Sequence, residues 1–194
     1  MESSLKNMTV TLLAIALASS LAVGLVYRVT EQPIAEAKSQ KIGAAIAQVL
    51  PPFDNDPAAD TTVVPYRDGE KIKEIVVYTA KQGENTVGYA IKTFSKNGFG
   101  GEIWLMAGFL PDGTICKVET LTHNETPGLG NKIERGKSDF AIQFEGKNPE
   151  TFRLSVKKDG GDVDAITAST ISSRAFTDAL TRAYEVFESI QKPE

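Results

Sequence analysis

The N-terminal segment of the chain carries an uncharged run long enough to cross a membrane. Residues Met8 to Tyr27 form 20 consecutive positions without a charged side chain. At about 1.5 Å per residue, a helix of that length spans about 30 Å, the thickness of the hydrocarbon core of a bilayer. Lys6 precedes the run and Arg28 follows it, so the flanking charges give only a weak orientation signal. The sequence therefore predicts a transmembrane anchor at residues 8–27, preceded by a short tail at residues 1–7.

A cleaved signal peptide is the alternative interpretation of this run, because Ala16-Leu17-Ala18 resembles a peptidase site. The apolar run continues past that point, however, and a mature chain beginning at Ser19 would start inside it. We therefore favour a retained anchor. The tail is too short to be a domain, so we expect the bulk of the chain on the opposite side of the membrane.

Composition limits what the remainder of the chain can be. With 194 residues, 41% of them hydrophobic, the chain has room for the anchor and one soluble domain with a sizeable core. The net charge of −4 and the lack of a Lys/Arg stripe argue against nucleic acid as a partner. Cys116 is the only cysteine and His123 the only histidine, which excludes a disulfide framework, a Cys-rich iron–sulfur site and a multi-histidine metal site.

The segment after the anchor, residues 28–60, reads as a helical stalk followed by an acidic loop. Pro33 is suited to the first turn of a helix, and the positions after it carry an apolar stripe. The helix is expected to end before Pro51-Pro52, because a proline disfavours helical geometry in the preceding residue. The pattern does not distinguish a free-standing stalk from a helix that packs on the sheet.

Most of the chain from residue 61 onward reads as strands. Four segments alternate or are rich in β-branched residues: 72–80, 86–94, 101–109 and 115–121. Pro111-Asp112-Gly113 is a strong turn signal between the last two. Phe152, Leu154 and Val156 suggest a further short strand. Strands joined by short turns, with helices at both ends, predict an α+β domain on a largely antiparallel sheet.

The C-terminal segment predicts an amphipathic helix with small hydroxyl residues at its start. Apolar residues recur there with helical period: Phe176, Ala179, Leu180, Ala183, Tyr184, Phe187 and Ile190. The first N–H groups of such a helix lack internal partners, and its dipole favours an anion, so a phosphate is a suitable ligand at that end. Ser and Thr are also ordinary N-caps, and helix physics alone favours the capping role.

The segment Asp164-Ala165-Ile166-Thr167-Ala168-Ser169-Thr170 resembles the flavinylation signature of the FMN-binding domain family. That signature reads Asp-x-x-Ser/Thr-Gly-Ala-Thr, so Ala168 replaces the usual Gly and Ser169 the usual Ala. The resemblance implies that FMN is joined through its phosphate to the hydroxyl of Thr170 by a separate flavin transferase. It also implies cofactor contacts for Asp164, Thr167, Ala168 and Ser169.

Two further segments resemble the same family. Thr122-His123-Asn124-Glu125-Thr126-Pro127-Gly128-Leu129-Gly130 is similar to its His-x-Glu-Thr-Pro-Gly-Leu-Gly motif, and Phe99-Gly100-Gly101 to its aromatic-Gly-Gly stretch. The three motifs occur in the expected order and cover roughly residues 85–190. The resemblance implies FMN contacts for five residues of the longer segment: Glu125, Thr126, Gly128, Leu129 and Gly130.

Two other polar residues are candidates for the site. Arg174 lies four residues after Thr170 on the same helical face and is placed to contact a phosphate, or else to lie in solvent. His123 has no nucleophile or Asp–His partner visible in the sequence, so we interpret it as structural. No catalytic residue and no metal ligand is predicted.

With its anchor included, the whole chain resembles the G-subunit family of Rnf-type electron transport complexes. The resemblance implies a flavoprotein subunit that relays electrons through covalent FMN in an ion-translocating ferredoxin:NAD oxidoreductase and is not catalytic alone. It implies a single-pass protein of the cell inner membrane, with residues 1–7 cytoplasmic and an extracytoplasmic (periplasmic) FMN-binding domain at residues 61–194. The expected partners are integral membrane subunits of the complex, the flavin transferase and membrane lipid.

Two alternatives remain at this stage. The C subunit of the sodium-translocating NADH:quinone reductase shares the motifs, but that relative is usually longer than 194 residues. A membrane-anchored binding or assembly module without a redox role is the alternative from another class. Covalently bound flavin would distinguish this non-redox module from the two flavoprotein subunits.

Overall fold

The computed structural model describes residues 2–69 and 71–191, and its contacts divide the chain into two compact units, Met1–Lys41 and Ile42–Glu194. The first unit consists of most of the helix α1 (Glu2–Val49). Among the described residues, α1 is long and apolar enough to cross a membrane. Its leucines face outward, with Leu17 62% and Leu21 66% exposed, as expected of side chains that meet lipid rather than a protein core.

The expectation that a helix begins at Pro33 is wrong. Pro33 lies inside α1, which runs without interruption from the apolar run into the segment that follows it. A proline in a helix interior removes one hydrogen bond and costs roughly 3 kcal/mol. Ending the helix and starting a second one would require a new and costly helix nucleus, whereas extending α1 adds one hydrogen bond per residue. The helix therefore continues through the proline.

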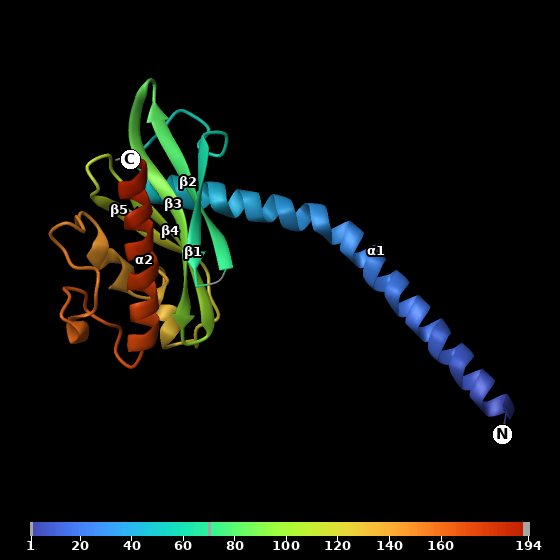
Figure 1. Ribbon diagram of the computed structural model, residues 1–194. Coiled ribbons are helices and arrows are strands. Elements are labelled where there is room, and N and C mark those ends of the chain that lie inside the picture. The colour runs from blue at the N-terminus through green and yellow to red at the C-terminus, as the bar shows by residue number, and fades with distance from the viewer. Residues whose placement is uncertain (1, 70, 192–194) are drawn as a thin grey trace. The chain divides into compact units, whose positions relative to one another are not determined.

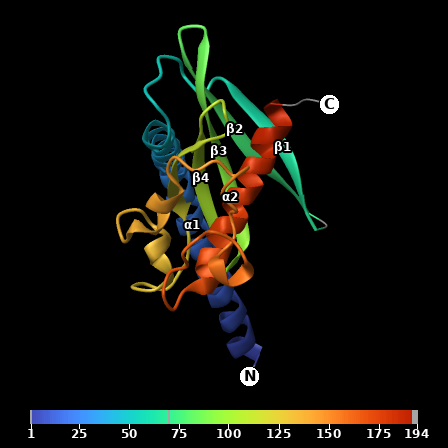
Figure 2. The same cartoon turned by 90° about the vertical axis from the view of Figure 1, so that its left-hand side faces the viewer.

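The second unit contains one antiparallel sheet whose five strands follow each other in space as they do in sequence (Figures 1 and 2). The strands are β1 (Thr61–Asp68), β2 (Lys71–Gln82), β3 (Asn85–Gly98), β4 (Gly101–Phe109) and β5 (Ile115–Thr122). The α+β class and the antiparallel sheet are therefore confirmed, and β4 has the expected bounds.

Two details of the strand prediction are wrong. The pattern missed β1, which lies at the edge of the sheet and includes Pro65, a residue tolerated only where a strand has a free side. Phe152, Leu154 and Val156 form no strand; among the described residues of this segment only an isolated bridge joins Val156 to Val163. Their alternation reflects side chains that pack on the core from an extended segment.

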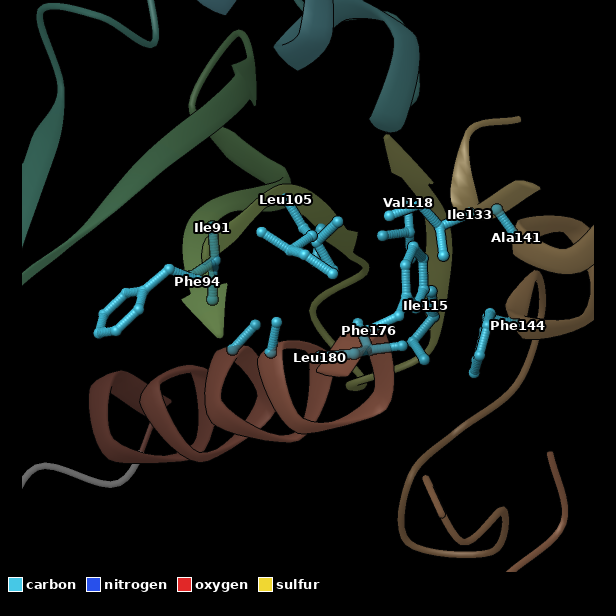
Figure 3. Packing of buried hydrophobic residues seen from close by; sticks show 14 of the residues in the cluster. Ile91, Phe94, Leu105, Ile115, Val118, Ile133, Ala141, Phe144, Phe176 and Leu180 are labelled. Carbon is cyan, nitrogen blue, oxygen red and sulfur yellow. The ribbon is translucent and has the colours of Figure 1, made fainter. Parts of the chain in front are cut away.

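The helix α2 (Thr170–Gln191) covers one face of the sheet, as both views show (Figures 1 and 2). Phe176 and Leu180 on α2 are fully buried in one cluster with Ile91, Leu105 and Ile115 of the sheet (Figure 3). Two 3₁₀ helices add buried residues to this core, η1 (Gly130–Ile133) and η2 (Asp139–Phe144), whereas η3 (Lys157–Asp159) has none. The predicted apolar face of the C-terminal helix is confirmed.

A second core lies on the opposite face of the sheet. The last turns of α1 contribute Ala45, Ile46 and Val49, which are at most 4% exposed. The approach is close at Gly108 of β4, where a Cβ atom would lie 2.0 Å from the Val49 carbonyl oxygen. The end of α1 therefore packs on the sheet, which answers the question that the sequence pattern left open.

Candidate functional site

A cavity of about 320 Å³ lies at the N-terminus of α2. Three segments that are far apart in the sequence form its walls, namely the β3–β4 turn, the loop between β5 and η1, and the start of α2. Its lining residues are Phe99, Glu125, Thr126, Leu129, Gly130, Ala168, Ser169, Thr170, Ile171 and Ser172. The cavity thus brings together residues from all three motifs of the sequence.

The two hydroxyl residues at the helix start have different environments. Thr170 is the first residue of α2 and is half-buried, whereas Ser169 is only 7% exposed. The Ser169 carbonyl accepts the Ser173 N–H (3.0 Å) and the Ser173 Oγ hydroxyl (3.0 Å). The N–H groups of residues 170–172 precede the first internal bond of the helix, and the first turn reads Thr-Ile-Ser-Ser, without charge. An anion is therefore favoured at this end of α2.

One of the two residues that depart from the family signature, Ala168, adopts an unusual backbone conformation. Ala168 has φ 60°, and it is the one non-glycine residue with positive φ in the described part of the chain. This left-handed conformation costs an L-residue with a Cβ about 1–2 kcal/mol and costs glycine little. The glycine that is usual at this position of the signature is thus explained by the turn into α2.

Glu125 is buried, with 4% of its surface exposed, and its carboxylate is turned toward the protein. Oε1 accepts the Gly100 backbone N–H at 3.0 Å, and Oε2 accepts the Ser172 hydroxyl at 2.5 Å. One side chain therefore connects the three walls of the cavity.

His123 fixes the backbone that carries Glu125. Its Nδ1 accepts the Glu125 N–H at 3.0 Å, which places the ring proton of the neutral form on Nε2. Nε2 lies 2.9 Å from Glu134 Oε1 and donates to it. The interpretation of His123 as structural agrees with these contacts, since both of its nitrogens are engaged within the protein.

Exposed apolar side chains gather around this cavity. Phe99 is 69% exposed, Ile171 48% and Leu129 43%, and each comes from a different wall. Large apolar side chains left in solvent around a concave site are typical of a ligand that covers them.

The remaining predicted residues lie near this cavity but not in its wall. Asp164 and Thr167 line a neighbouring cavity, where Asp164 pairs with Lys157 at 2.7 Å. Gly128 has φ 78° and lies next to the lining residue Leu129, and its N–H donates to the Asn131 side chain at 2.8 Å.

Arg174 lines a third cavity and is paired with Asp159. Its Nε and one terminal nitrogen each lie 2.7 Å from an Asp159 oxygen. The hydrogen bonds from Arg174 lower the pKa of Asp159, and the same contact raises the pKa of Arg174. The guanidinium thus has an acidic partner in the absence of any phosphate.

Sequence reasoning missed three lining residues: Phe99, Ile171 and Ser172. Phe99 was part of a motif, but nothing in a single sequence shows that a hairpin tip reaches the start of α2. Ile171 is the one apolar residue of the uncharged first turn and lies off the buried face of the helix, which was the available signal. Ser172 is identified only by its contact with Glu125.

The lining residues fit a flavin mononucleotide. The apolar side chains of Phe99, Leu129 and Ile171 suit an aromatic ring system, and the N-terminus of α2 suits a phosphate. The cavity volume lies within the roughly 300–1,000 Å³ of small-molecule sites. Among residues 2–69 and 71–191, no group of three or more His, Cys, Asp or Glu side chains is placed to hold a metal ion. Fold and cavity together define a membrane-anchored flavin-binding domain.

Comparison with known proteins agrees with this class. The FMN-binding domain family matches residues 98–185, which include all three walls of the cavity. The G subunit of an ion-translocating oxidoreductase complex from Shewanella amazonensis is 36% identical over 200 residues, covering 100% of this chain and 93% of the relative. Proteins of the same name from Cereibacter sphaeroides (34% identical; 89% of this chain, 80% of the relative) and Vibrio atlanticus (30%; 95% and 91%) are also similar.

The chain therefore belongs to the G-subunit family of ion-translocating oxidoreductase complexes. This membership confirms the predicted class, a membrane-anchored, FMN-binding flavoprotein subunit for electron transfer.

Proposed function

We propose that this chain carries FMN as a phosphoester on Thr170 and relays electrons through it within an ion-translocating complex. One observation carries the proposal. Thr170 is at once the first residue of α2, half-buried, and part of the wall of the cavity. A hydroxyl there is accessible to a modifying enzyme, and a phosphate attached to it meets the free N–H groups of the helix N-terminus, an interaction worth roughly 0.3–1 kcal/mol.

The attachment step requires an activated flavin phosphate and a flavin transferase. Thr170 Oγ1 attacks the phosphorus of a flavin phosphoanhydride, the bond from phosphorus to the bridging oxygen breaks, and a nucleoside monophosphate leaves. The hydroxyl proton passes to a base on the transferase. The product retains one negative charge on the phosphodiester, which the N-terminus of α2 stabilises.

Once FMN is bound, it supplies the redox chemistry, and this chain supplies position and surroundings. Thr170 tethers the phosphate, so the site stays filled whatever the concentration of free flavin. Phe99, Leu129 and Ile171 provide the apolar surface, and the N–H groups at residues 170–172 hold the anionic end. Each electron enters from one neighbouring protein and leaves to another without release of the cofactor.

The setting of this relay is also proposed. We place the chain in the cell inner membrane, in contact with lipid along residues 8–27, with residues 1–7 cytoplasmic and the FMN-binding domain periplasmic. Its partners are the other subunits of the complex, and the overall reaction couples electron transfer between ferredoxin and NAD to movement of Na⁺ or H⁺. The alternative, the C subunit of a NADH:quinone reductase, is disfavoured because this chain spans 93% of a G-subunit relative.

In-gel fluorescence tests the attachment. The full-length chain, co-expressed with the transferase and denatured in acid, is expected to give a yellow-green fluorescent band. Thr170→Ala removes the band, whereas Ser169→Ala retains it, because the Ser169 hydroxyl is buried. A dark wild-type band would favour a non-redox anchored module, and a fluorescent Thr170→Ala band would place the flavin elsewhere.

A further inference from the structure

We propose that Glu125 is a positioning residue that holds the three walls of the flavin cavity together and fixes a negative charge beside the cofactor. The second half of this proposal rests on the proposed function, since it concerns bound flavin. The first half concerns the protein alone and is tested without cofactor.

The carboxylate acts as a clamp between elements distant in sequence. Its Oε1 accepts the N–H of Gly100 in the β3–β4 turn at 3.0 Å, and its Oε2 accepts the hydroxyl of Ser172 in the first turn of α2 at 2.5 Å. Gly100 is the neighbour of Phe99, and Ser172 lies two residues after Thr170. Glu125 thereby sets the position of an apolar wall relative to the attachment site.

The surrounding backbone is shaped to receive this carboxylate. A Cβ at Gly130 would lie 2.3 Å from Oε2, and a Cβ at Gly98 would lie 2.6 Å from Oε1. Both positions therefore require glycine for the carboxylate to reach its partners. A side chain enclosed in this way is a fixed part of the cavity wall rather than a group that swings into a ligand.

A second layer of contacts fixes Glu125 itself. The Glu125 N–H donates to His123 Nδ1 at 3.0 Å, and the opposite ring nitrogen of His123 donates to Glu134 at 2.9 Å. His123 thus fixes the backbone of the loop that carries Glu125. The other two walls are joined to this loop by the Glu125 carboxylate, so we expect loss of that side chain to release them.

The charge on Glu125 is met by dipoles. A backbone N–H and a serine hydroxyl donate to the carboxylate, and both of its oxygens act as acceptors, as in an ionised carboxylate. Dipoles stabilise a charge without cancelling its field, and that field is stronger in a poorly hydrated site than in water. An electron that arrives without a proton adds negative charge to the cavity, so Glu125 opposes reduction and lowers the midpoint potential of the bound flavin.

Two variants separate the clamp from the charge. Glu125→Gln keeps the shape, and its amide oxygen still accepts the Gly100 N–H while the Ser172 hydroxyl turns to accept from the amide nitrogen. Glu125→Ala removes both bonds. Glu150→Gln is the matched control, because it removes one negative charge from an exposed position.

The clamp is tested first, on full-length chain made without the transferase, by amide hydrogen exchange. Exchange of the Gly100 amide is expected to be at least tenfold faster in Glu125→Ala and near wild type in Glu125→Gln. Ser172→Ala, which keeps the carboxylate and removes one donor, is expected to give an intermediate rate. Equal exchange in the wild type and Glu125→Ala would overturn the clamp.

The charge is tested on chain made with the transferase, by titration with dithionite followed in the visible spectrum. Dithionite supplies the electrons and is oxidised to sulfite. An upward shift of the midpoint potential is expected in Glu125→Gln, and none in Glu150→Gln. A Glu125→Gln potential equal to that of the wild type would overturn the role of the charge. A wild-type chain that carries no flavin would instead contradict the proposed function and leave the exchange result to decide the clamp.

Discussion

The Arg174 guanidinium meets the Asp159 carboxylate through two hydrogen bonds of 2.7 Å, side by side. This pair joins the second turn of α2 to η3, in the segment that precedes the helix. Two other ion pairs, Arg153–Asp162 and Lys157–Asp164, brace the same segment. Exposed charge pairs therefore add to the buried Val156, Val163 and Ile166 in holding the chain that leads to Thr170, and a phosphate contact by Arg174 requires an exchange of partner.

Substitution of Asp159 is expected to lower stability in a pH-dependent way. Because the hydrogen bonds from Arg174 hold the pKa of Asp159 below its ordinary value of 3.8, its contribution is complete above that value and is lost as the pH falls through the lower, folded-state pKa. Urea unfolding should therefore show Asp159→Asn less stable than the wild type at pH 7. The two should converge as the pH falls below the folded-state pKa of Asp159, and their difference should shrink in about 1 M salt, since exposed pairs are screened. A difference that persists in acid would contradict this.

Replacement of Ala168 by glycine is expected to stabilise the chain. The φ of 60° costs alanine about 1–2 kcal/mol, whereas the added freedom of glycine in the unfolded chain costs about 0.4–1 kcal/mol. The net gain in the free energy of unfolding should reach about 1 kcal/mol by urea denaturation. Ala165→Gly, in the same segment but at a position without positive φ, is the control and should lower stability. Equal losses in both variants would show that the left-handed turn is not strained.

Gly108→Ala is expected to separate the end of α1 from the sheet. The new Cβ would lie 2.0 Å from the Val49 carbonyl oxygen, a backbone atom that moves only with the helix. Overpacking of this kind costs roughly 1–3 kcal/mol. Gly136→Ala is the matched control, because a Cβ there meets no atom within 4 Å of the described chain. Full-length chain in detergent should show a lower unfolding midpoint for the first variant alone, and equal midpoints would argue against this contact.

Cys116 is expected to react slowly with alkylating reagents while the chain is folded. Burial raises the pKa of its thiol from 9.0 to about 11, which lowers the thiolate fraction at pH 8 about 100-fold. Iodoacetamide labelling followed by mass spectrometry should therefore be slower in native than in urea-unfolded chain, because the loss of thiolate outweighs the higher nucleophilicity of a thiolate with a raised pKa. The same shift lowers the free energy of unfolding as the pH rises above 9.0, because the unfolded thiol loses its proton first. Equal labelling rates would contradict the burial.

The sequence alone correctly predicted the elements whose apolar pattern arises from a single buried face. The alternation along 101–109 and the helical period from Phe176 to Ile190 both arise from one buried face, and both predictions are confirmed. The apolar pattern gave a wrong prediction where strand pairing or core packing, rather than one buried face, determines the structure. β1 is an edge strand with a proline, and residues 152–156 alternate because they pack on the core without a partner strand.

The sequence predicted individual residues of the candidate site but not how they are arranged in space. Motifs located Glu125, Leu129 and Thr170, but spacing does not tell which way a carboxylate points. Glu125 was expected to contact the cofactor; it lines the cavity, and its carboxylate binds Gly100 and Ser172, two contacts that the sequence did not reveal. Such long-range contacts depend on how turns and helix ends meet, which a single sequence does not encode in any local pattern.

Peptide mapping of the full-length chain, purified from membranes of cells that contain the flavin transferase, tests the central claim most directly. The peptide that spans Thr170 should carry the mass of FMN less water, and fragmentation should place that mass on the Thr170 oxygen. The same peptide from Thr170→Ala should be unmodified. An unmodified wild-type peptide, or an FMN mass that fragmentation places on Ser169 or another residue, would contradict the account.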